Sequence, residues 1–445
     1  MNQAYSIGHF IVAVAVVMTI APLSLRAEGM SLQAAIMRAL SEHPRVGAAE
    51  AGRAAAQQAL RQERSGYYPT FSLSAGAGGV RREDDATRTV AALAGEESDA
   101  ATDFAQDVRV VLRQPVFDWM ATPNRVSAAE RRVKARDFAV ADAGETIALQ
   151  AADAFLRLHA ARRLRDRAQS LVDAMREYRE NVAMLAAEGA GDQTSLARVE
   201  ALVAGARANL VEAEGRIRAA EADWRQAIGG IPPRVLDPAA SALAMPADIE
   251  AAVNKVEETN PAVLGALEQA EARGHDVTAA RRSLLPRLDA ELSYFRDEEN
   301  ADLGGQTIAA EALLRLSWDF SLGGGDLARV AQSAAQREQS VMTWREQQRL
   351  AERQARRDVN EYRTAQSTEK LVKDRLAASE KVLRLTEELF EGGQSTLLDL
   401  VAVTNEAYQA RFRVIEAERR TTLAKLRLLA TLGRLRQAVE LPPQR

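Results

Sequence analysis

The run Leu285-Pro286-Arg287-Leu288-Asp289-Ala290-Glu291-Leu292-Ser293-Tyr294 is the most informative part of this sequence. Apolar side chains alternate in it with charged or hydroxyl side chains, and a period of two places the two sets on opposite faces of a β-strand. An apolar face opposite a charged face over about 10 residues is typical of a strand between lipid and an aqueous lumen. A soluble sheet half-buried on its own helices would show the same alternation, so this pattern alone leaves both interpretations open.

The same alternation occurs in three other places. Its apolar members are Phe71, Leu73, Ala75 and Ala77 in the first predicted strand, Val108, Val110 and Leu112 in the second, and Leu314, Leu316, Trp318 and Phe320 in the fourth. The charged residues that we expect to line a lumen are Asp107, Arg109, Arg113, Asp289, Glu291, Arg315 and Asp319. Aromatic residues expected at or near strand ends, as interfacial girdles, are Tyr67, Tyr68, Trp119, Tyr294 and Trp318. Four strands cannot close a barrel that encloses water, so the barrel interpretation requires several copies of the chain.

The chain contains one internal repeat. Pro44 and Pro69 recur as Pro261 and Pro286, both 217 positions later, and Gly191 recurs as Gly393. Each half follows one plan: a helix, two short strands, a very long helix, a glycine turn and another helix. We therefore expect a first repeat at 28–229, a proline-rich linker at 230–248 and a second repeat at 249–445.

Two segments without proline predict unusually long helices. They run from about Asn124 to Ala187 and from about Asp326 to Glu391, and each exceeds 60 residues. Each helix would be about 95 to 100 Å long at 1.5 Å per residue. An a/d heptad spacing, which predicts coiled-coil packing, is present in Leu164, Ala168, Leu171, Met175, Tyr178, Val182 and Leu185, and it continues in Val382, Leu385 and Leu389 of the second half.

Glycines predict the turn that ends each long helix. They are Gly189 and Gly191 in the first half and Gly392 and Gly393 in the second. Glycine permits the positive φ common at a helix C-terminus. Hydroxyl residues that follow the turns can cap the returning helices: Thr194 or Ser195 in the first half, and Ser395 or Thr396 in the second. Each half therefore ends in a helical hairpin far from its strands.

Composition argues against several functions. There is no cysteine, which excludes disulfides, thiolate metal sites and a lipidated N-terminal cysteine. The four histidines are never within one helical turn of each other, so we expect no metal, no cofactor and no enzymatic site. The acidic loops at 81–103 and 297–306 do not have the spacing of an EF-hand. A net charge of −4 argues against nucleic acid as a partner.

The first residues resemble an export signal. Ile11 to Ala21 form an apolar run, interrupted only by Thr19, that is too short for a confident spanning helix. We expect residues 1–27 to be a signal peptide cleaved after Ala27, with an uncleaved N-terminal anchor as the alternative.

A set of motifs in fixed order carries a family resemblance. The motifs are Leu32-Gln33-Ala34-Ala35-Ile36, Tyr68-Pro69-Thr70-Phe71, Leu112-Arg113-Gln114-Pro115-Val116-Phe117-Asp118 and Gly393-Gln394-Ser395-Thr396-Leu397-Leu398-Asp399-Leu400. Each motif is weak alone, but their order and the duplication cover nearly the whole mature chain. The sequence resembles the TolC-like outer-membrane efflux and secretion channels.

The resemblance implies a mainly α protein with a small transmembrane β part. Three chains would form one 12-stranded β-barrel in outer-membrane lipid, continued by an α-helical barrel in the periplasm. The hairpin tips would dock onto a periplasmic adaptor and an inner-membrane ABC or RND transporter. The channel would conduct substrate passively, because the energy comes from the inner-membrane partner.

The resemblance also implies a gate at the tip of the second hairpin. By position Asp399 would form an acidic ring that favours cations. Two residues depart from the family pattern: Ser395 replaces a basic residue, and Ala402 replaces a second aspartate, so a gate-locking ion pair is in doubt and the ring is single. Phe390 occupies a position that is often aromatic at the closed tip. Taken alone, Asp399 would be an ordinary carboxylate at a helix start.

Other functions remain open at this stage. A periplasmic adaptor would bridge the two membranes with a helical hairpin, but adaptors usually have one hairpin and a compact β domain. A structural coiled-coil protein would not need four amphipathic strands. Within the channel interpretation, the absence of cysteine slightly favours type I secretion over drug efflux, because many efflux channels carry a lipid anchor.

Overall fold

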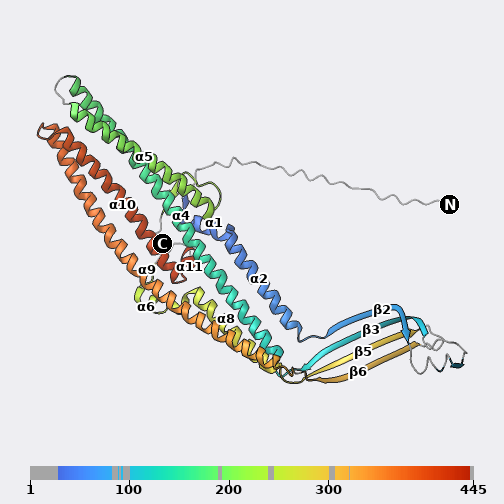
Figure 1. The fold of residues 1–445 in the computed structure, drawn as a ribbon. Helices are drawn as coiled ribbons and strands as arrows, with labels where there is room; N and C mark the ends of the chain where they lie inside the picture. The colour runs from blue at the N-terminus through green and yellow to red at the C-terminus, as the bar shows by residue number, and fades with distance from the viewer. Residues whose placement is uncertain are drawn as a thin grey trace, which may run out of the picture.

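The molecule is long and narrow, with a sheet at one end and the tips of two helical hairpins at the other (Figure 1). This architecture comes from a computed structural model. The described residues are 29–82, 89, 92–93, 101–188, 193–238, 245–299, 306–319 and 321–440. The expected signal peptide, and also Gly189, Gly191 and Phe320, lie outside them.

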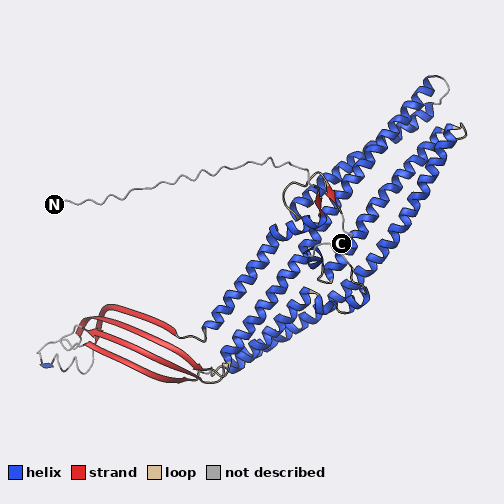
Figure 2. Cartoon of the chain, turned by 180° about the vertical axis from the view of Figure 1, so that it is seen from behind, coloured by secondary structure: helices blue, strands red, loops and turns tan. Residues whose placement is uncertain are grey.

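Four antiparallel strands form one sheet in the order β2–β3–β5–β6 (Figure 2). Their bounds are Thr70–Arg82 for β2, Ala101–Phe117 for β3, Arg287–Glu299 for β5 and Gln306–Ser317 for β6. The register places Arg113 of β3 opposite Glu291 of β5. It shifts between Pro115 and Phe117, where proline cannot donate a ladder hydrogen bond. Each half of the chain therefore contributes one hairpin to a shared sheet.

The two halves have helices of equal length. The long helices α4 and α9 have 67 residues each, about 100 Å, and the returning helices α5 and α10 have 35 each. The bounds are Pro44–Ser65 for α2, Ala121–Ala187 for α4, Gln193–Ala227 for α5, Pro261–Arg282 for α8, Gly325–Glu391 for α9 and Leu397–Thr431 for α10. The expected fold class is confirmed: the chain is mainly helical, with a small β part and two repeats.

Short elements surround the middle of α4. They are β1 at Met30–Ser31, α1 at Leu32–Glu42, β4 at Leu236–Asp237, α6 at Ile249–Asn254, α7 at Val256–Thr259 and α11 at Leu435–Glu440. The strands β1 and β4 pair in parallel, which the sequence pattern did not predict. Phe155 of α4 and Trp224 of α5 are fully buried here, with ring centroids 6.0 Å apart. This region contains the largest apolar core of the described chain.

The helices form single rows rather than a globular bundle. Toward the tips, α5 contacts α4, α4 contacts α10, and α10 contacts α9. Toward the sheet, α2 contacts α4, α4 contacts α8, and α8 contacts α9. The outer helix is thus α5 or α2 on one side of each row and α9 on the other, just as β2 and β6 are the outer strands of the sheet (Figure 1).

The turn from sheet to helix uses left-handed backbone in both halves. Gly324, the N-cap of α9, has φ 73°, and Met120, the N-cap of α4, has φ 69°. Trp119 also has a positive φ of 59°. Left-handed backbone costs about 1–2 kcal/mol for a residue with a side chain, so the first half is strained where the second is relaxed.

The structure corrects three sequence predictions. The fourth strand ends at Ser317, so Trp318 and Asp319 follow it and Asp319 does not belong to the sheet. Tyr294 lies well inside β5 rather than near its end. Val382, Leu385 and Leu389 are 49, 48 and 46% exposed, and the buried positions nearby are Ser379 and Leu383. That row of α9 therefore does not pack within the chain, although the row on α4 is buried from Leu164 to Val182 except for the half-buried Tyr178.

Among the described residues, no helix is both long enough and apolar enough to cross a membrane.

Candidate functional site

The tip of the second hairpin is closed by backbone hydrogen bonds. The N–H of Gln394 donates to the carbonyl of Leu389 at 2.8 Å, and the N–H of Gly393 donates to the carbonyl of Phe390 at 3.0 Å. Gly393 has φ 70°, whereas the φ of Gly392 is −78° and would suit any residue. Only one of the two predicted turn glycines therefore needs to be glycine on conformational grounds.

Asp399 belongs to a capping box at the start of α10. Its Oδ2 accepts from the N–H of Thr396 at 3.2 Å and from the hydroxyl of Thr396 at 2.6 Å. In return, the N–H of Asp399 donates to Oγ1 of Thr396 at 3.2 Å. This reciprocal arrangement satisfies two backbone donors of the first turn. Because the Asp399 side chain remains exposed, its charge is available to solvent as well.

The other two predicted gate residues differ from Asp399 in their surroundings. Ser395 is half-buried and immediately precedes the N-cap. Phe390 packs, with Tyr178 of α4, against the buried cluster formed by Leu383, Leu400 and Ala407. Phe390 is therefore part of the apolar contact within the tip, and its side chain lies partly inside that cluster.

The register places six of the seven predicted lumen residues on one face of the sheet. Residues that are paired across strands point to the same side, and residues two apart on a strand do so too. Arg113 is opposite Glu291, and Asp289 is opposite Arg315. Arg109 and Asp107 follow Arg113 at steps of two or four, so all six share the polar face. Asp319 is the exception, because it lies beyond β6.

Ion pairs cross this polar face. Glu291 of β5 binds Arg113 of β3 at 3.1 Å and Arg315 of β6 at 3.1 Å. Arg287 binds Asp289 on the same strand at 3.2 Å, and Asp289 is only 3% exposed. The lower part of the polar face is thus an ionic network over three strands. Alternation predicted the residue types, but the pairing requires the sheet order.

Farther along the polar face, Arg109 lies over the ring of Phe295, 4.9 Å from its centroid. Phe295 was absent from the predicted set, because an apolar residue interrupts the polar alternation there. Contact between a guanidinium and an aromatic face is favourable. The missed residue could have been found from the cross-strand register alone, since Phe295 is directly opposite Arg109.

The opposite face of the sheet is apolar and bare. Leu73, Leu314 and Leu316 on it are 63, 72 and 68% exposed. In a soluble sheet half-buried on its own helices, these side chains would be covered by the chain, but the helices lie beyond the end of the sheet (Figure 2). The structure therefore excludes that alternative for the four strands described. An uncovered apolar face of this extent indicates contact with lipid or with another protein.

Two tryptophans fix the junction between sheet and helices. The indole N–H of Trp119 donates to the carbonyl of Pro286 at 2.7 Å, and that of Trp318 donates to the carbonyl of Leu284 at 3.0 Å. The residues after β3 and after β6 thus hold the same short segment before β5. Tyr67 and Tyr68 precede β2 and are exposed. These aromatic residues are positioned as an interfacial girdle would be.

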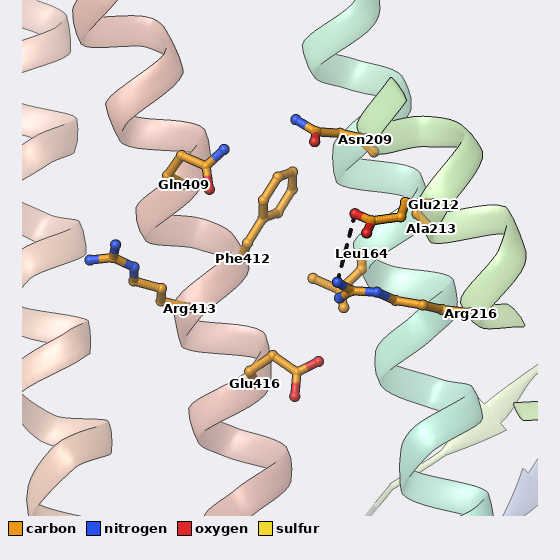
Figure 3. Close-up of a pocket in the computed structure, with 10 residues that line it drawn as sticks. Leu164, Asn209, Glu212, Ala213, Arg216, Gln409, Phe412, Arg413 and Glu416 are labelled. Atoms are coloured by element: carbon orange, nitrogen blue, oxygen red, sulfur yellow. Dashed lines mark ion pairs between the residues drawn. The ribbon is translucent and has the colours of Figure 1, made fainter. Parts of the chain in front are cut away.

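A cleft of about 270 Å³ lies where α5, α4 and α10 meet (Figure 3). Leu164 of α4 and Phe412 of α10 contribute apolar surface. Glu212 and Arg216 form an ion pair at 3.9 Å on α5, while Arg413 and Glu416 project from α10. The sequence patterns did not predict this cleft. Its four charged side chains balance, so charge alone gives it no preference for anions or cations. Among the described residues, no three His, Asp or Glu side chains are placed to hold a metal ion.

Comparison with known proteins agrees with this geometry. The pattern of the family described as outer membrane efflux protein matches residues 35–230 and 252–434. The chain is 24% identical, over 339 residues, to the outer membrane efflux protein BepC of Brucella suis biovar 1 (strain 1330), which covers 75% of this chain and 74% of that protein.

Solved structures share the fold. The open state of the Neisseria gonorrhoeae MtrE outer membrane channel superposes with a TM-score of 0.72 at 17% identity, over 98% of both chains. The Campylobacter jejuni CmeC outer membrane channel gives a TM-score of 0.74 at 13% identity, over 91% of this chain and 86% of that one. The family consists of transport proteins rather than enzymes. The chain therefore belongs to the outer membrane efflux protein family, as an outer-membrane channel of an efflux system.

Proposed function

We propose that three copies of this chain close into one channel, with a 12-stranded β-barrel in the outer membrane and a helical barrel that extends into the periplasm. The observation that carries the proposal is the set of unpaired edges. The sheet ends at β2 on one side and β6 on the other, and the helical rows end at α5 or α2 and at α9. A bare strand edge is normally paired or covered.

These edges suit a head-to-tail ring. Joining the β6 edge of one chain to the β2 edge of the next also brings α9 of the first chain toward α5 and α2 of the second. A heterologous contact of this kind closes when its rotation closes. Three chains supply 12 strands, enough for a barrel with an aqueous interior.

The helix edges also have complementary shapes. Leu371, Val382, Leu385 and Leu389 form an exposed apolar row on α9. Ala201, Gly205 and Ala208 form an exposed row of small residues on α5. Large side chains against small ones allow close helix approach, as in knobs-into-holes packing. The apolar residues of α9 that are bare in one chain would thus be covered by the neighbouring chain.

In this assembly the two faces of the sheet have separate roles. The face with Leu73, Leu314 and Leu316 contacts outer-membrane lipid, and the face with Arg113 and Glu291 lines the water-filled lumen. Helices of about 100 Å extend far beyond a membrane, which suits a passage across the periplasm. Substrate moves passively, delivered by a periplasmic adaptor and an inner-membrane ABC or RND transporter that dock at the hairpin tips.

Asp399 is the proposed selectivity element of the tip. Its carboxylate is exposed and repeated three times around the axis, which would give an acidic ring that favours cations. The capping box does not oppose this role, because it orients the carboxylate at the first turn of α10. Ser395 and Phe390 flank the ring, Ser395 beside the cap and Phe390 within the apolar contact.

The second candidate function, a periplasmic adaptor, is less well supported. An adaptor has no use for a sheet with one bare apolar face and one ionic face. The family match favours efflux as the transport process, and a role in type I secretion stays a prediction that depends on which transporter binds.

The test is membrane fractionation of the full chain in a Gram-negative host, followed by native mass measurement in detergent. We expect an outer-membrane trimer. A monomer in the periplasm, or a chain retained in the inner membrane, would contradict the channel assembly and favour the adaptor.

A further inference from the structure

Two tyrosines reach across the contact between α4 and α10 in opposite directions. The hydroxyl of Tyr178 on α4 lies 3.1 Å from Oγ1 of Thr404 on α10. The hydroxyl of Tyr408 on α10 donates to the backbone carbonyl of Ser170 on α4 at 3.3 Å. These bonds join the hairpin α4/α5 to the hairpin α9/α10 in the half of the molecule near the tips.

The direction of the first bond follows from its surroundings. Thr404 is 3% exposed, and its hydroxyl donates to the carbonyl of Leu400 at 2.7 Å. A hydroxyl has one proton, so Thr404 can only accept from Tyr178. Burial raises the pKa of Tyr178, which keeps its proton in place at neutral pH. Both tyrosines are therefore donors, each to a group on the opposite hairpin.

The ring of Tyr178 lies at the meeting point of two apolar clusters. One cluster is centred on Leu171, Met175 and Val401, and the other on Leu383 and Leu400. The ring thus packs against both hairpins while the hydroxyl bonds across them. A phenylalanine would keep this packing and lose only the bond.

Tyr408 connects three helices. Arg411 lies over its ring at 5.0 Å and binds Glu380 of α9 at 3.0 Å. A chain of contacts therefore runs from the Ser170 carbonyl on α4, through Tyr408 and Arg411 on α10, to Glu380 on α9. Movement of α10 away from α4 would break both tyrosine bonds.

We propose that Tyr178 and Tyr408 are positioning residues that clasp the second hairpin to the first, and that release of this clasp is the step that lets the tip open. The inference rests on the proposed channel function. Thr404 follows Asp399 by five residues on α10, about 7.5 Å along the helix axis. The clasp therefore fixes the position of the helix start that carries Asp399.

The expected size of the effect follows from ordinary hydrogen-bond strengths. Loss of one neutral bond shifts an equilibrium by about 2- to 13-fold. If three subunits open together, one substitution present in every chain shifts the ratio of open to closed tips by roughly 10- to 1,000-fold.

Distances between the two tips provide the direct test. The chain has no cysteine, so cysteines introduced at the exposed positions Glu188 and Gln394 can be spin-labelled specifically. Labelled chains diluted into unlabelled ones report distances within one chain. Tyr178→Phe and Tyr408→Phe should each lengthen and broaden this distance. The matched control is Tyr362→Phe, because Tyr362 accepts a bond from Gln366 on its own helix, α9, at 2.8 Å.

A double-mutant cycle separates the clasp from general destabilisation. Thr404→Val removes the acceptor, so its effect on the tip distance and that of Tyr178→Phe should not add when combined. Thermal unfolding midpoints should stay close to that of the unchanged chain. Unchanged distances in both tyrosine variants, an equal change in Tyr362→Phe, or full additivity would each overturn the proposal.

The clasp and the channel can fail separately. Both tyrosine bonds lie within one chain, so the tip distance tests the clasp even if native mass shows a monomer. If the trimer forms and the distances respond, currents across planar bilayers should rise in the two clasp variants and stay unchanged in Tyr362→Phe. A trimer whose current does not respond would contradict the role of the clasp in opening.

Discussion

Replacement of Glu145 by glutamine should make unfolding of the chain less sensitive to pH. Glu145 is 6% exposed in the middle of α4. Its Oε2 accepts from the N–H of Leu435 at 3.1 Å and its Oε1 from the N–H of Arg436 at 3.2 Å, the first two residues of α11. Burial raises the pKa of Glu145 to about 7, against the opposing effects of these N–H groups and of the Arg436 guanidinium. The nearby Asp142 raises it further.

The sign and size of the effect follow from proton linkage. In the unfolded chain this carboxyl has its ordinary pKa of 4.5. Because the folded chain holds the proton more tightly, the free energy of unfolding is highest below pH 4.5 and falls as the pH rises through 7. The full loss for one such group is about 3 kcal/mol. Glutamine resembles the protonated carboxyl at every pH, so the variant should match the unchanged chain within about 1 kcal/mol at pH 5 and exceed it by about 3 kcal/mol at pH 8.

Thermal unfolding followed by circular dichroism at pH 5 and pH 8 measures this difference. For a chain of 445 residues, 1 kcal/mol corresponds to about 1 °C in the midpoint, so we expect the variant to unfold about 3 °C higher at pH 8. Glu180→Gln is the matched control, because Glu180 is an exposed carboxyl on the same helix. The same pH dependence in Glu145→Gln and in the unchanged chain would refute the reasoning, as would an equal response of Glu180→Gln.

Three other predictions follow from the structure. Asp399→Asn should lower the cation-to-anion permeability ratio roughly 5- to 10-fold in planar bilayers, because three charges are lost near the axis; Thr396→Ala, which breaks the cap and keeps the charge, should leave this ratio unchanged, and an equal drop would mean that the cap matters and not the charge. Leu385→Asp on the α9 edge should shift native mass from trimer to monomer, whereas Ile231→Asp, also at an exposed apolar position but outside the helical rows, should not; a trimer in both would contradict the proposed helix contact. Met120→Gly should raise the free energy of unfolding in urea by roughly 0.5–1 kcal/mol, because glycine relieves left-handed backbone at φ 69°; a decrease would show that the Met120 side chain contributes more than the strain costs.

Sequence patterns predicted the elements well where the cause is local. The absence of proline between Asn124 and Ala187 predicted one long helix, and α4 indeed runs from Ala121 to Ala187. The predicted cap at Thr396 is present with the expected bonds. Helix length, helix capping and strand alternation depend on residues within a few positions of each other, so a single sequence contains the relevant information.

The same patterns were less reliable where neighbours decide. The alternation in the fourth strand continues through Asp319, but pairing ends at Ser317, because β5 begins opposite it at Arg287. The heptad spacing of Val382 and Leu385 predicted a buried row, yet another side of α9 faces α10. A periodic pattern shows that a face is apolar, and only the position of the next element shows what covers it.

The candidate site divides in the same way. Residue types and order were enough to indicate Asp399 and the charged face of the strands. Tertiary structure alone brought Arg113, Glu291 and Arg315 together, because the pairing of β3 with β5 joins segments 178 residues apart. It also placed Tyr178 against Thr404, across 226 residues.

By itself, the amino-acid sequence determined the two repeats, the strand and helix types, and the family, because these depend on local periodicity and on motifs in order. The tertiary structure decided which faces and edges remain bare, which charges pair, and how the two hairpins are held together. These properties arise from contacts between distant segments, and their geometry is set only when the chain has packed.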